Sequence, residues 1–178
     1  MAIVDNWILS SLAKIERLEH LKDFFSQDVK TPPSVMEELE EAIRGFNFVK
    51  AIKGIKTFSS ASLSPERWLL VAPLTEGEEE LSAAIMAEVG LAKPDADCMA
   101  LAERRKEILL TDDAYAGKVA QERGVQVFDL KTFLEACIIK GIIKTLKEVK
   151  WIISELRRKD FYEFSSEDQE ALLSHFES

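Results

Sequence analysis

Residues 108–128, ILLTDDAYAGKVAQERGVQVF, contain the pattern that decides the fold. The apolar run Ile108–Leu110 is typical of a buried parallel strand, and Gly124 is a natural end for the helix that follows it. A second apolar run completes the stretch, which therefore predicts a strand, a helix and another strand. The pattern places Asp112 and Asp113 after the carboxyl end of the first strand, where open α/β sheets bind their ligands.

The two aspartates also allow a purely structural explanation. An Asp that precedes a helix often caps it by accepting a hydrogen bond from a backbone N–H group. Taken alone, the stretch favours this structural role for the pair. A functional role requires further acidic residues at the same edge of the sheet.

Strands and helices alternate along most of the chain. Further strands are expected at residues 2–5, in a short segment that ends at Lys30, and at residues 68–71, whereas residues 46–75 as a whole show the weakest pattern. Helices are expected at residues 15–25, from 35, at 78–89, from 94, at 129–141, 144–158 and 166–176. This order predicts a three-layer α/β/α domain with a central parallel sheet of four or five strands. We expect residues 1–143 to form that domain and residues 144–178 to form a helical appendage packed on it.

The composition indicates a soluble protein. The chain has 178 residues and a formal net charge of −9, and no apolar run approaches the roughly 20 residues that span a bilayer. Cys98 and Cys137 are too far apart in sequence for a zinc knuckle, and no apolar leader opens the chain. We therefore expect a cytoplasmic protein without disulfides and without a membrane partner.

Two stretches are locally basic in this acidic chain. The first contains Arg44, Lys50, Lys53 and Lys56, with Phe46 and Phe48 between them. The second contains Lys140, Lys144, Lys147, Lys150, Arg157, Arg158 and Lys159. Either stretch can bind the phosphates of a nucleic acid, although basic residues on helices often only face solvent.

Acidic residues recur where the expected strands end or the next helices begin. The candidate positions are Asp5, Glu37 or Glu38, Asp95 or Asp97, and Asp112 or Asp113. The apolar face of the helix that contains the glutamates consists of Val35, Leu39, Ala42 and Ile43. At about 100° per residue, Glu38 lies about 90° from the centre of that face and Glu37 lies nearly opposite it. Glu38 is therefore the better candidate.

The same counting separates the aspartates of the helix expected from Pro94. Asp95 shares a face with the apolar residues of that helix, whereas Asp97 lies beside Arg104. The place of Asp97 indicates an ion pair or a role in the first helical turn. We therefore prefer Asp95 as the functional acid.

Carboxylates grouped at one edge of a sheet suit a hard divalent cation. Mg²⁺ and Mn²⁺ take oxygen ligands and keep several waters, so a substrate phosphate can join them. A phosphatase or receiver-type domain would need more acids after the first strand than the lone Asp5. His20 and His175 do not indicate a histidine mechanism, and neither GxGxxG nor GxxxxGK[ST] is present.

Four motifs in this order resemble those of the PIN-domain nucleases, which include the toxin nucleases of toxin–antitoxin pairs and archaeal endonucleases of ribosomal RNA maturation. The motifs are AIVD with Asp5, TPPSVMEEL with Glu38, PDADCMALA with Asp95 and LLTDDAYAGKVAQERGV with Asp113. Residues 144–176 also resemble the last segment of the family, which favours its small prokaryotic and archaeal branch. The likeness covers most of the chain.

The resemblance implies an endoribonuclease that uses Mg²⁺ or Mn²⁺ to hydrolyse phosphodiester bonds of single-stranded RNA. It implies that Asp5, Asp95 and Asp113 are metal ligands, that Glu38 is a ligand or orients water, and that Asp112 is an outer alternate ligand. RNA is the expected partner. The resemblance leaves open an antitoxin or ribosomal partner and a homodimer.

One departure from the family pattern supports an alternative. The family usually has Ser or Thr after the first aspartate, whereas this chain has Asn6 and Trp7. Asn6 can still form a hydrogen bond near a metal. The alternative is a catalytically silent PIN-like domain that binds RNA or a protein partner.

Overall fold

The computed structural model describes residues 1–42 and 46–177. Ile43 of the expected helix face and Arg44 of the first basic stretch lie outside the described residues. In chain order the elements are β1 (Ala2–Val4), α1 (Asn6–Lys14), α2 (Glu19–Phe24), β2 (Val29–Thr31), α3 (Pro33–Ala42), α4 (Asn47–Ile55), β3 (Lys56–Thr57), the 3-10 helix η1 (Ser60–Ser62), β4 (Leu69–Val71), α5 (Glu76–Val89), α6 (Lys93–Arg105), β5 (Ile108–Leu110), α7 (Ala114–Glu122), β6 (Val127–Phe128), α8 (Leu130–Ile139), α9 (Leu146–Asp160) and α10 (Ser166–Ser174).

Six strands form one parallel sheet in the order β3-β4-β2-β1-β5-β6. Ile3 of the central β1 pairs with Lys30 on one side and Leu109 on the other. The predicted α/β class is confirmed, with one strand more than the upper expected number. β3 has two residues and pairs only with β4 at the sheet edge, so its sequence is too short to show a strand pattern.

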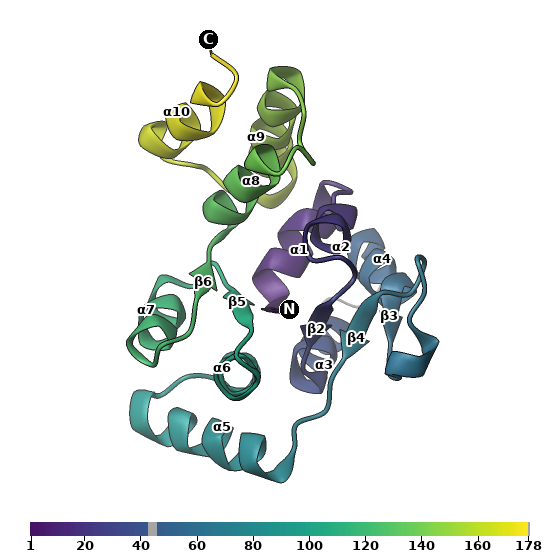
Figure 1. Ribbon diagram of the computed structural model, residues 1–178, viewed down its shortest axis with the longest axis vertical. Helices are drawn as coiled ribbons and strands as arrows, with labels where there is room; N and C mark the ends of the chain where they lie inside the picture. The colour runs from purple at the N-terminus through teal and green to yellow at the C-terminus, as the bar shows by residue number, and fades with distance from the viewer. Residues whose placement is uncertain (43–45, 178) are drawn as a thin grey trace.

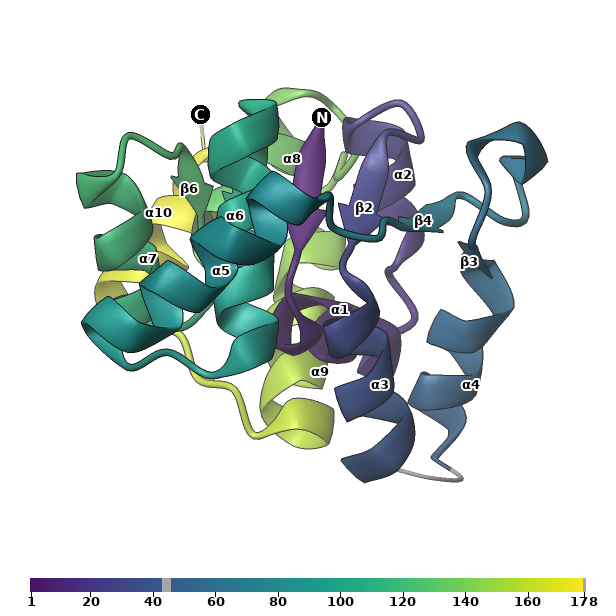
Figure 2. The ribbon, with the colours of Figure 1, turned by 90° about the horizontal axis from the view of Figure 1, so that it is seen from below.

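Helices cover both faces of the sheet. Figure 1 shows α1 and α8 on one side of it and α5 and α6 on the other. All three residues of β1 are 0% exposed, as expected for a strand covered on both faces. Figure 2 shows β1 running from the N-terminus down to α1, and β2 running in the same direction to α3. The carboxyl ends of these strands therefore lie at one edge of the sheet.

Local signals set the boundaries of the helices on either side of β6. Asp113 caps α7 by accepting a hydrogen bond from the Ala116 N–H at 2.8 Å, and Asp129 caps α8 through the Thr132 N–H at 2.8 Å. Gly124 has φ of 84°, a left-handed conformation that suits glycine after a helix. These are the boundaries that the sequence predicts.

The helix expected over residues 15–25 is shorter in the structure, where only α2 lies within this range. α1 ends before this range, the chain turns through Glu16 at φ of 57°, and α2 follows. Ile15 and Leu21 are both fully buried. Their helical spacing therefore arises because two consecutive segments pack on one core, and not because one helix continues through them.

The C-terminal helices pack on the rest of the chain. α9 contacts α1, and α10 contacts α8 and α9. Leu156 and Leu172 are buried in the same apolar cluster as β1. At the end of α9, Asp160 accepts hydrogen bonds from Ser11 Oγ and Lys14 Nζ of α1, both at 2.6 Å. The expected boundary between the domain and its appendage stays a prediction.

Two findings bear on the expected surroundings of the chain. In the described part of the chain, no helix is long and apolar enough to cross a membrane. Cys98 and Cys137 are buried thiols and do not form a disulfide. Burial raises the pKa of Cys137 to about 12 and that of Cys98 well above its ordinary value, so both thiols keep their protons at neutral pH.

Asp97 of α6 connects three helices through its carboxylate. Ser34 of α3 and Ser82 of α5 donate their hydroxyl hydrogens to its two oxygens, at 2.6 and 2.5 Å. Lys93 Nζ lies 3.1 Å from one of these oxygens. The Asp97 side chain is almost completely buried, so these partners replace the water that an exposed carboxylate would bind. The expected ion pair of Asp97 is therefore present, but with Lys93 and not with Arg104.

Replacing Asp97 with alanine should lower the free energy of unfolding by about 2–4 kcal/mol, because Ser34 and Ser82 would lose their partner in a buried region. Urea denaturation measures this change. Glu80→Ala is the control, since Glu80 is an exposed acid of α5 and its loss should change the free energy by less than about 0.5 kcal/mol. Similar values for the two variants would contradict a connecting role for Asp97.

Candidate active site

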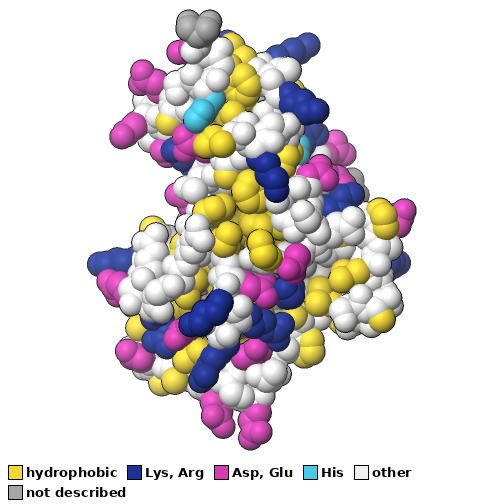
Figure 3. All heavy atoms as spheres, viewed as in Figure 1, with side chains coloured by type: hydrophobic (Ala, Val, Ile, Leu, Met, Phe, Trp, Pro, Cys, Tyr) yellow, Lys and Arg dark blue, Asp and Glu magenta, His cyan; other side chains and the backbone are white. Residues whose placement is uncertain are grey.

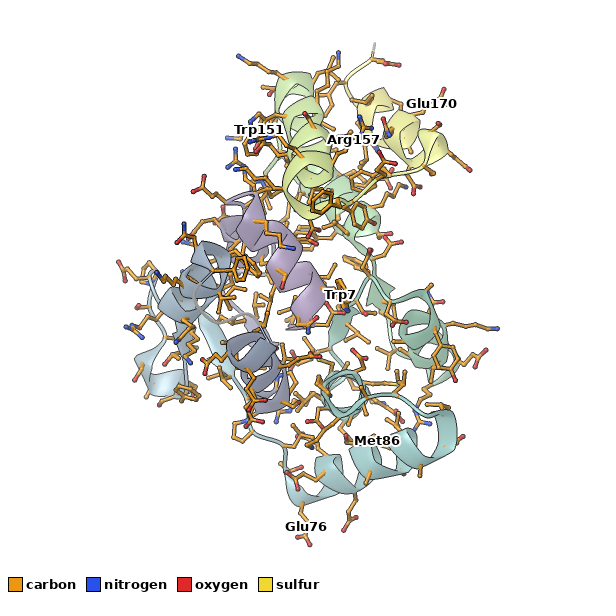
Figure 4. The ribbon with its side chains drawn as sticks, turned by 180° about the vertical axis from the view of Figure 1, so that it is seen from behind. Trp7, Glu76, Met86, Trp151, Arg157 and Glu170 are labelled. Carbon is orange, nitrogen blue, oxygen red and sulfur yellow. The ribbon has the colours of Figure 1, made fainter. Side chains whose placement is uncertain are left out.

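Four acidic residues lie directly after strands or in the helices that follow them. Asp5 follows β1, Asp113 follows β5, Glu38 lies in α3 after β2, and Asp95 lies in the first turn of α6. Figure 4 shows this side of the molecule, with Trp7 at the beginning of α1 near its centre. The predicted acids thus come from four separate segments of the chain.

Asp5 is buried and caps α1. Its carboxylate accepts hydrogen bonds from the Ile8 N–H at 2.9 Å and from the Thr111 hydroxyl at 2.7 Å. Burial raises the pKa of Asp5 from 3.8 to about 7; the two hydrogen bonds lower it, and the charges of Asp95 and Asp112 raise it. The ionised form of Asp5 is therefore costly in the metal-free protein and would gain from a nearby cation.

Electrostatic coupling places the acids in one region. Burial raises the pKa of Asp95, and the charges of Asp113 and Glu38 raise it further. Asp95 in turn raises the pKa of Asp5. Asp95 therefore lies within electrostatic range of the other three acids that the sequence analysis selected.

The Asn6 side chain connects Glu38 to the end of β1. Asn6 Nδ2 donates a hydrogen bond to Glu38 Oε2. Both Glu38 and Glu37 are exposed, but within the described part of the chain only Glu38 has this contact. The sequence contains no local signal for the pair, because 32 positions separate its members.

Thr111 is a site residue that sequence reasoning missed. Its hydroxyl donates to Asp5 and accepts the Asp113 N–H at 3.3 Å. One buried side chain thus links the segments that follow β1 and β5. The signal in the sequence is the position of Thr111 two residues before Asp113, since a hydroxyl can accept the backbone N–H two residues later.

Asp112 connects the same loop to α8 and to the C-terminal segment. Its Oδ1 accepts hydrogen bonds from the Leu130 N–H at 3.1 Å and from the Tyr162 hydroxyl at 3.2 Å. Burial raises the pKa of Asp112 and also that of Tyr162. These contacts hold two later segments of the chain against the loop that contains Asp113.

A model of a protein family matches nearly the whole chain. The model is that of the PIN domain, and it matches residues 1–177. The chain belongs to the PIN-domain family. Members of this family are typically metal-dependent nucleases. Searches of curated proteins and of solved structures found no match.

The acids of this PIN domain suit a divalent cation by their chemistry. Among residues 1–42 and 46–177, no group of three or more His, Cys, Asp or Glu side chains could hold a metal ion as the side chains stand. Mg²⁺ usually binds proteins through one or two carboxylates and keeps several waters. Asp5 and Asp95 have raised pKa values, mainly because they are buried, and a cation would stabilise the charged form of these hard oxygen donors.

Many basic side chains of this PIN domain are already paired with acids. Figure 3 shows the face opposite to that of Figure 4, where Lys and Arg side chains lie among Asp and Glu side chains. Lys30 lies 2.9 Å from Glu107. In the first basic stretch, Lys56 pairs with Glu40 at 2.6 Å, whereas Lys50 and Lys53 of α4 are exposed. Lys144, Lys147 and Lys150 of the second stretch are exposed as well.

The raised pKa of Asp5 predicts how the stability of the metal-free PIN domain changes with pH. Its pKa is about 7 in the folded chain and 3.8 ordinarily, so between these values the folded chain keeps a proton that the unfolded chain has released. Stability should therefore fall as the pH rises from about 4 to about 7. Asn can replace Asp as a helix cap. In EDTA, Asp5→Asn should reduce the fall between pH 5 and pH 8 by at least about 1 kcal/mol, since one pKa unit corresponds to about 1.4 kcal/mol.

Urea denaturation at several pH values measures this slope. Asp129→Asn is the matched control, because Asp129 also caps a helix but is exposed. It should leave the slope as it is in the unmodified chain. If Asp5→Asn and Asp129→Asn show the same slope, the raised pKa of Asp5 is contradicted.

Proposed function

We propose that this PIN domain is a metal-dependent endoribonuclease that hydrolyses phosphodiester bonds of single-stranded RNA. Its catalytic residues in this proposal are Asp5, Glu38, Asp95 and Asp113. The observation that carries the proposal is the position of these acids at one edge of the parallel sheet, where the hydrogen bonds of Asn6 and Thr111 connect Asp5 and its neighbour to Glu38 and Asp113. The family membership supports nuclease chemistry, and the RNA specificity rests on the resemblance of the motifs.

In the proposed site, Asp5, Asp95 and Asp113 hold Mg²⁺ or Mn²⁺. When bound, the cation supplies activation of the attacking water and stabilisation of the charge that develops on the phosphate and the leaving oxygen. Hydrogen bonds within the chain keep two of these carboxylates in place. Thr111 holds Asp5, and the N–H group at the beginning of α7 holds Asp113.

Glu38 orients the attacking water or accepts its proton in this proposal. A general base must lie within hydrogen-bond reach of the proton that it removes. The Asn6 amide holds one oxygen of the Glu38 carboxylate, which keeps this exposed side chain near the other acids. Asn6 is thus a positioning residue that acts through Glu38.

The charge distribution favours a single strand over a duplex as substrate. A duplex carries one negative charge about every 1.7 Å along its axis, so it would bring several phosphates against the acidic edge at once. A flexible strand can place one phosphate at the acids while others lie near exposed lysines such as Lys50 and Lys53. Single-stranded RNA therefore fits the site better.

A catalytically silent PIN-like domain is the second candidate. It is favoured by Asn6 and Trp7, which stand where the family usually has Ser or Thr after the first aspartate. The hydrogen bond from Asn6 to Glu38 argues against a silent domain, because Asn6, although it differs from the family pattern, orients one of the four acids. Catalysis is therefore the better supported proposal.

The chain should cleave labelled single-stranded RNA in Mg²⁺ or Mn²⁺, and EDTA should abolish the cleavage. Asp113→Asn keeps a capping side chain on α7 but loses a ligand charge, so the rate should fall by orders of magnitude. Denaturing gels of the products measure the rate. Asp129→Asn, the same change at the exposed cap of α8, should remain active. Cleavage that persists in EDTA would contradict the proposal.

The choice between the two glutamates can be tested with amide variants. Glu38→Gln should lower the turnover rate by roughly 10²–10⁴-fold, the usual contribution of a general base, although Gln can still accept the Asn6 hydrogen bond. Glu37→Gln should change it by only a few-fold, because Glu37 has no contact with the end of β1 within the described chain. Single-turnover kinetics in Mn²⁺ compare the two, and equal effects would show that Glu38 is not the reactive glutamate.

A further inference from the structure

Two exposed aromatic side chains line a pocket beside the candidate metal ligands. The pocket has a volume of about 390 Å³, and its lining includes Trp7, Phe161, Asp113, Asp160 and Tyr162. Trp7 is 63% exposed and Phe161 is 89% exposed, although both are large apolar residues. Figure 4 shows Trp7 at the beginning of α1 on this side of the molecule. Neither ring has a part in the metal site proposed above.

Phe161 has an unfavourable backbone conformation as well as an exposed ring. It follows the last turn of α9 with φ of 55°, in the left-handed region that glycine usually occupies. A bulky residue is rare there. Glycine would remove both the strain and the exposed apolar surface. Folding therefore does not explain a phenylalanine at this position.

Neighbouring contacts hold Phe161 at the pocket. On one side of it, Asp160 is bound by Ser11 and Lys14 of α1. On the other side, the Tyr162 hydroxyl donates to Asp112, and the Tyr162 ring packs edge-on against the buried Phe164. The residues before and after Phe161 are thus fixed to different elements. These contacts therefore fix the direction of the chain at Phe161.

Trp7 reaches the same pocket from α1. It lies four residues before Ser11, so the two side chains share one face of the helix. Because Ser11 binds Asp160, this face of α1 is next to the segment that contains Phe161. Trp7 also follows directly after Asp5 and Asn6. One short segment therefore provides a proposed metal ligand, the residue that orients Glu38 and an exposed ring.

We propose that Trp7 and Phe161 bind a base of single-stranded RNA by stacking and so position the adjacent phosphodiester bond at the acids. This inference rests on the proposed function, since it assigns a substrate contact to the same site. Stacking on aromatic rings adds affinity for single strands that does not depend on basic side chains, and the described residues that line this pocket include no Lys or Arg. A base also carries N–H donors on its edge, which the pocket oxygens of Asp112, Asp113 and Tyr162 can accept. An apolar side chain of a protein partner would bring no donor to these oxygens beyond the donors that they already have within the chain.

Binding of a short fluorescein-labelled single-stranded RNA, followed by anisotropy of the full chain in EDTA and again in Ca²⁺, tests the proposal. Trp7→Ala and Phe161→Ala should each weaken binding by about tenfold, as expected for the loss of one stacked base. Phe58→Ala is the control, because Phe58 is 69% exposed but follows β3 at the far edge of the sheet. It should bind RNA as the unmodified chain does.

Phe161→Gly separates an RNA contact from a role in folding. It removes the ring and relieves the left-handed conformation, so its melting temperature should equal or exceed that of the unmodified chain. Its RNA affinity should nevertheless fall as in Phe161→Ala. A lower melting temperature with unchanged RNA affinity would assign Phe161 to folding and overturn its place in the proposal.

An oligonucleotide of equal length with abasic positions separates base stacking from phosphate binding. The unmodified chain should bind it about tenfold more weakly than the intact RNA, whereas Trp7→Ala should discriminate much less. The proposal is overturned if the unmodified chain binds no RNA in either condition, or if both aromatic variants keep their RNA affinity. The second result would leave a protein partner as the occupant of the pocket. Base-dependent binding without cleavage in Mn²⁺ would contradict only the proposed catalytic function.

Discussion

The burial of acidic side chains at the carboxyl edge of the sheet, together with repulsion from neighbouring acids, is the constraint on which the rest of the site depends. Asp5 and Asp113 are each placed at the beginning of a helix, where a backbone N–H group binds the carboxylate at 2.9 and 2.8 Å respectively. The positive end of the helix dipole offsets part of the repulsion. Asp95, in the first turn of α6, has a similar position. Parallel strands make this possible, because several helices begin at the same edge of the sheet.

Contacts between distant parts of the chain enclose this edge. Thr111 joins the segments after β1 and β5, and Asp112 binds Tyr162. Asp160, two residues before Tyr162, is bound to α1. The C-terminal segment is therefore attached both to α1, which follows the first proposed metal ligand, and to the loop that contains the last one. A pocket beside Asp113 is built from both ends of the chain as a result.

The parts of the structure that follow from short-range rules could be predicted from the sequence, and the others could not. Asp113 as a cap and Gly124 as a helix end were visible because each signal lies within a few residues of its effect. Helical spacing also selected Glu38 and Asp95, and the structure brings both near the other acids. In contrast, β3 has too few residues to show a period. The pairing of Asn6 with Glu38 spans 32 positions, and that of Asp112 with Tyr162 spans 50, so only the fold reveals them.

Asn6 and Trp7, where the chain departs from the family pattern, give the proposed site two features: a side chain that orients Glu38 and an exposed ring. A hydroxyl side chain after Asp5 would be short, whereas Asn6 reaches Glu38 and Trp7 adds a large exposed ring. In a chain with a net charge of −9, attraction between basic side chains and phosphates would supply only part of the affinity for the proposed RNA substrate. Stacking is less sensitive to that charge because every base has an aromatic face. In the proposed contact Phe161 provides the second ring. This ring is exposed, and its residue has an unfavourable backbone conformation that folding alone does not explain.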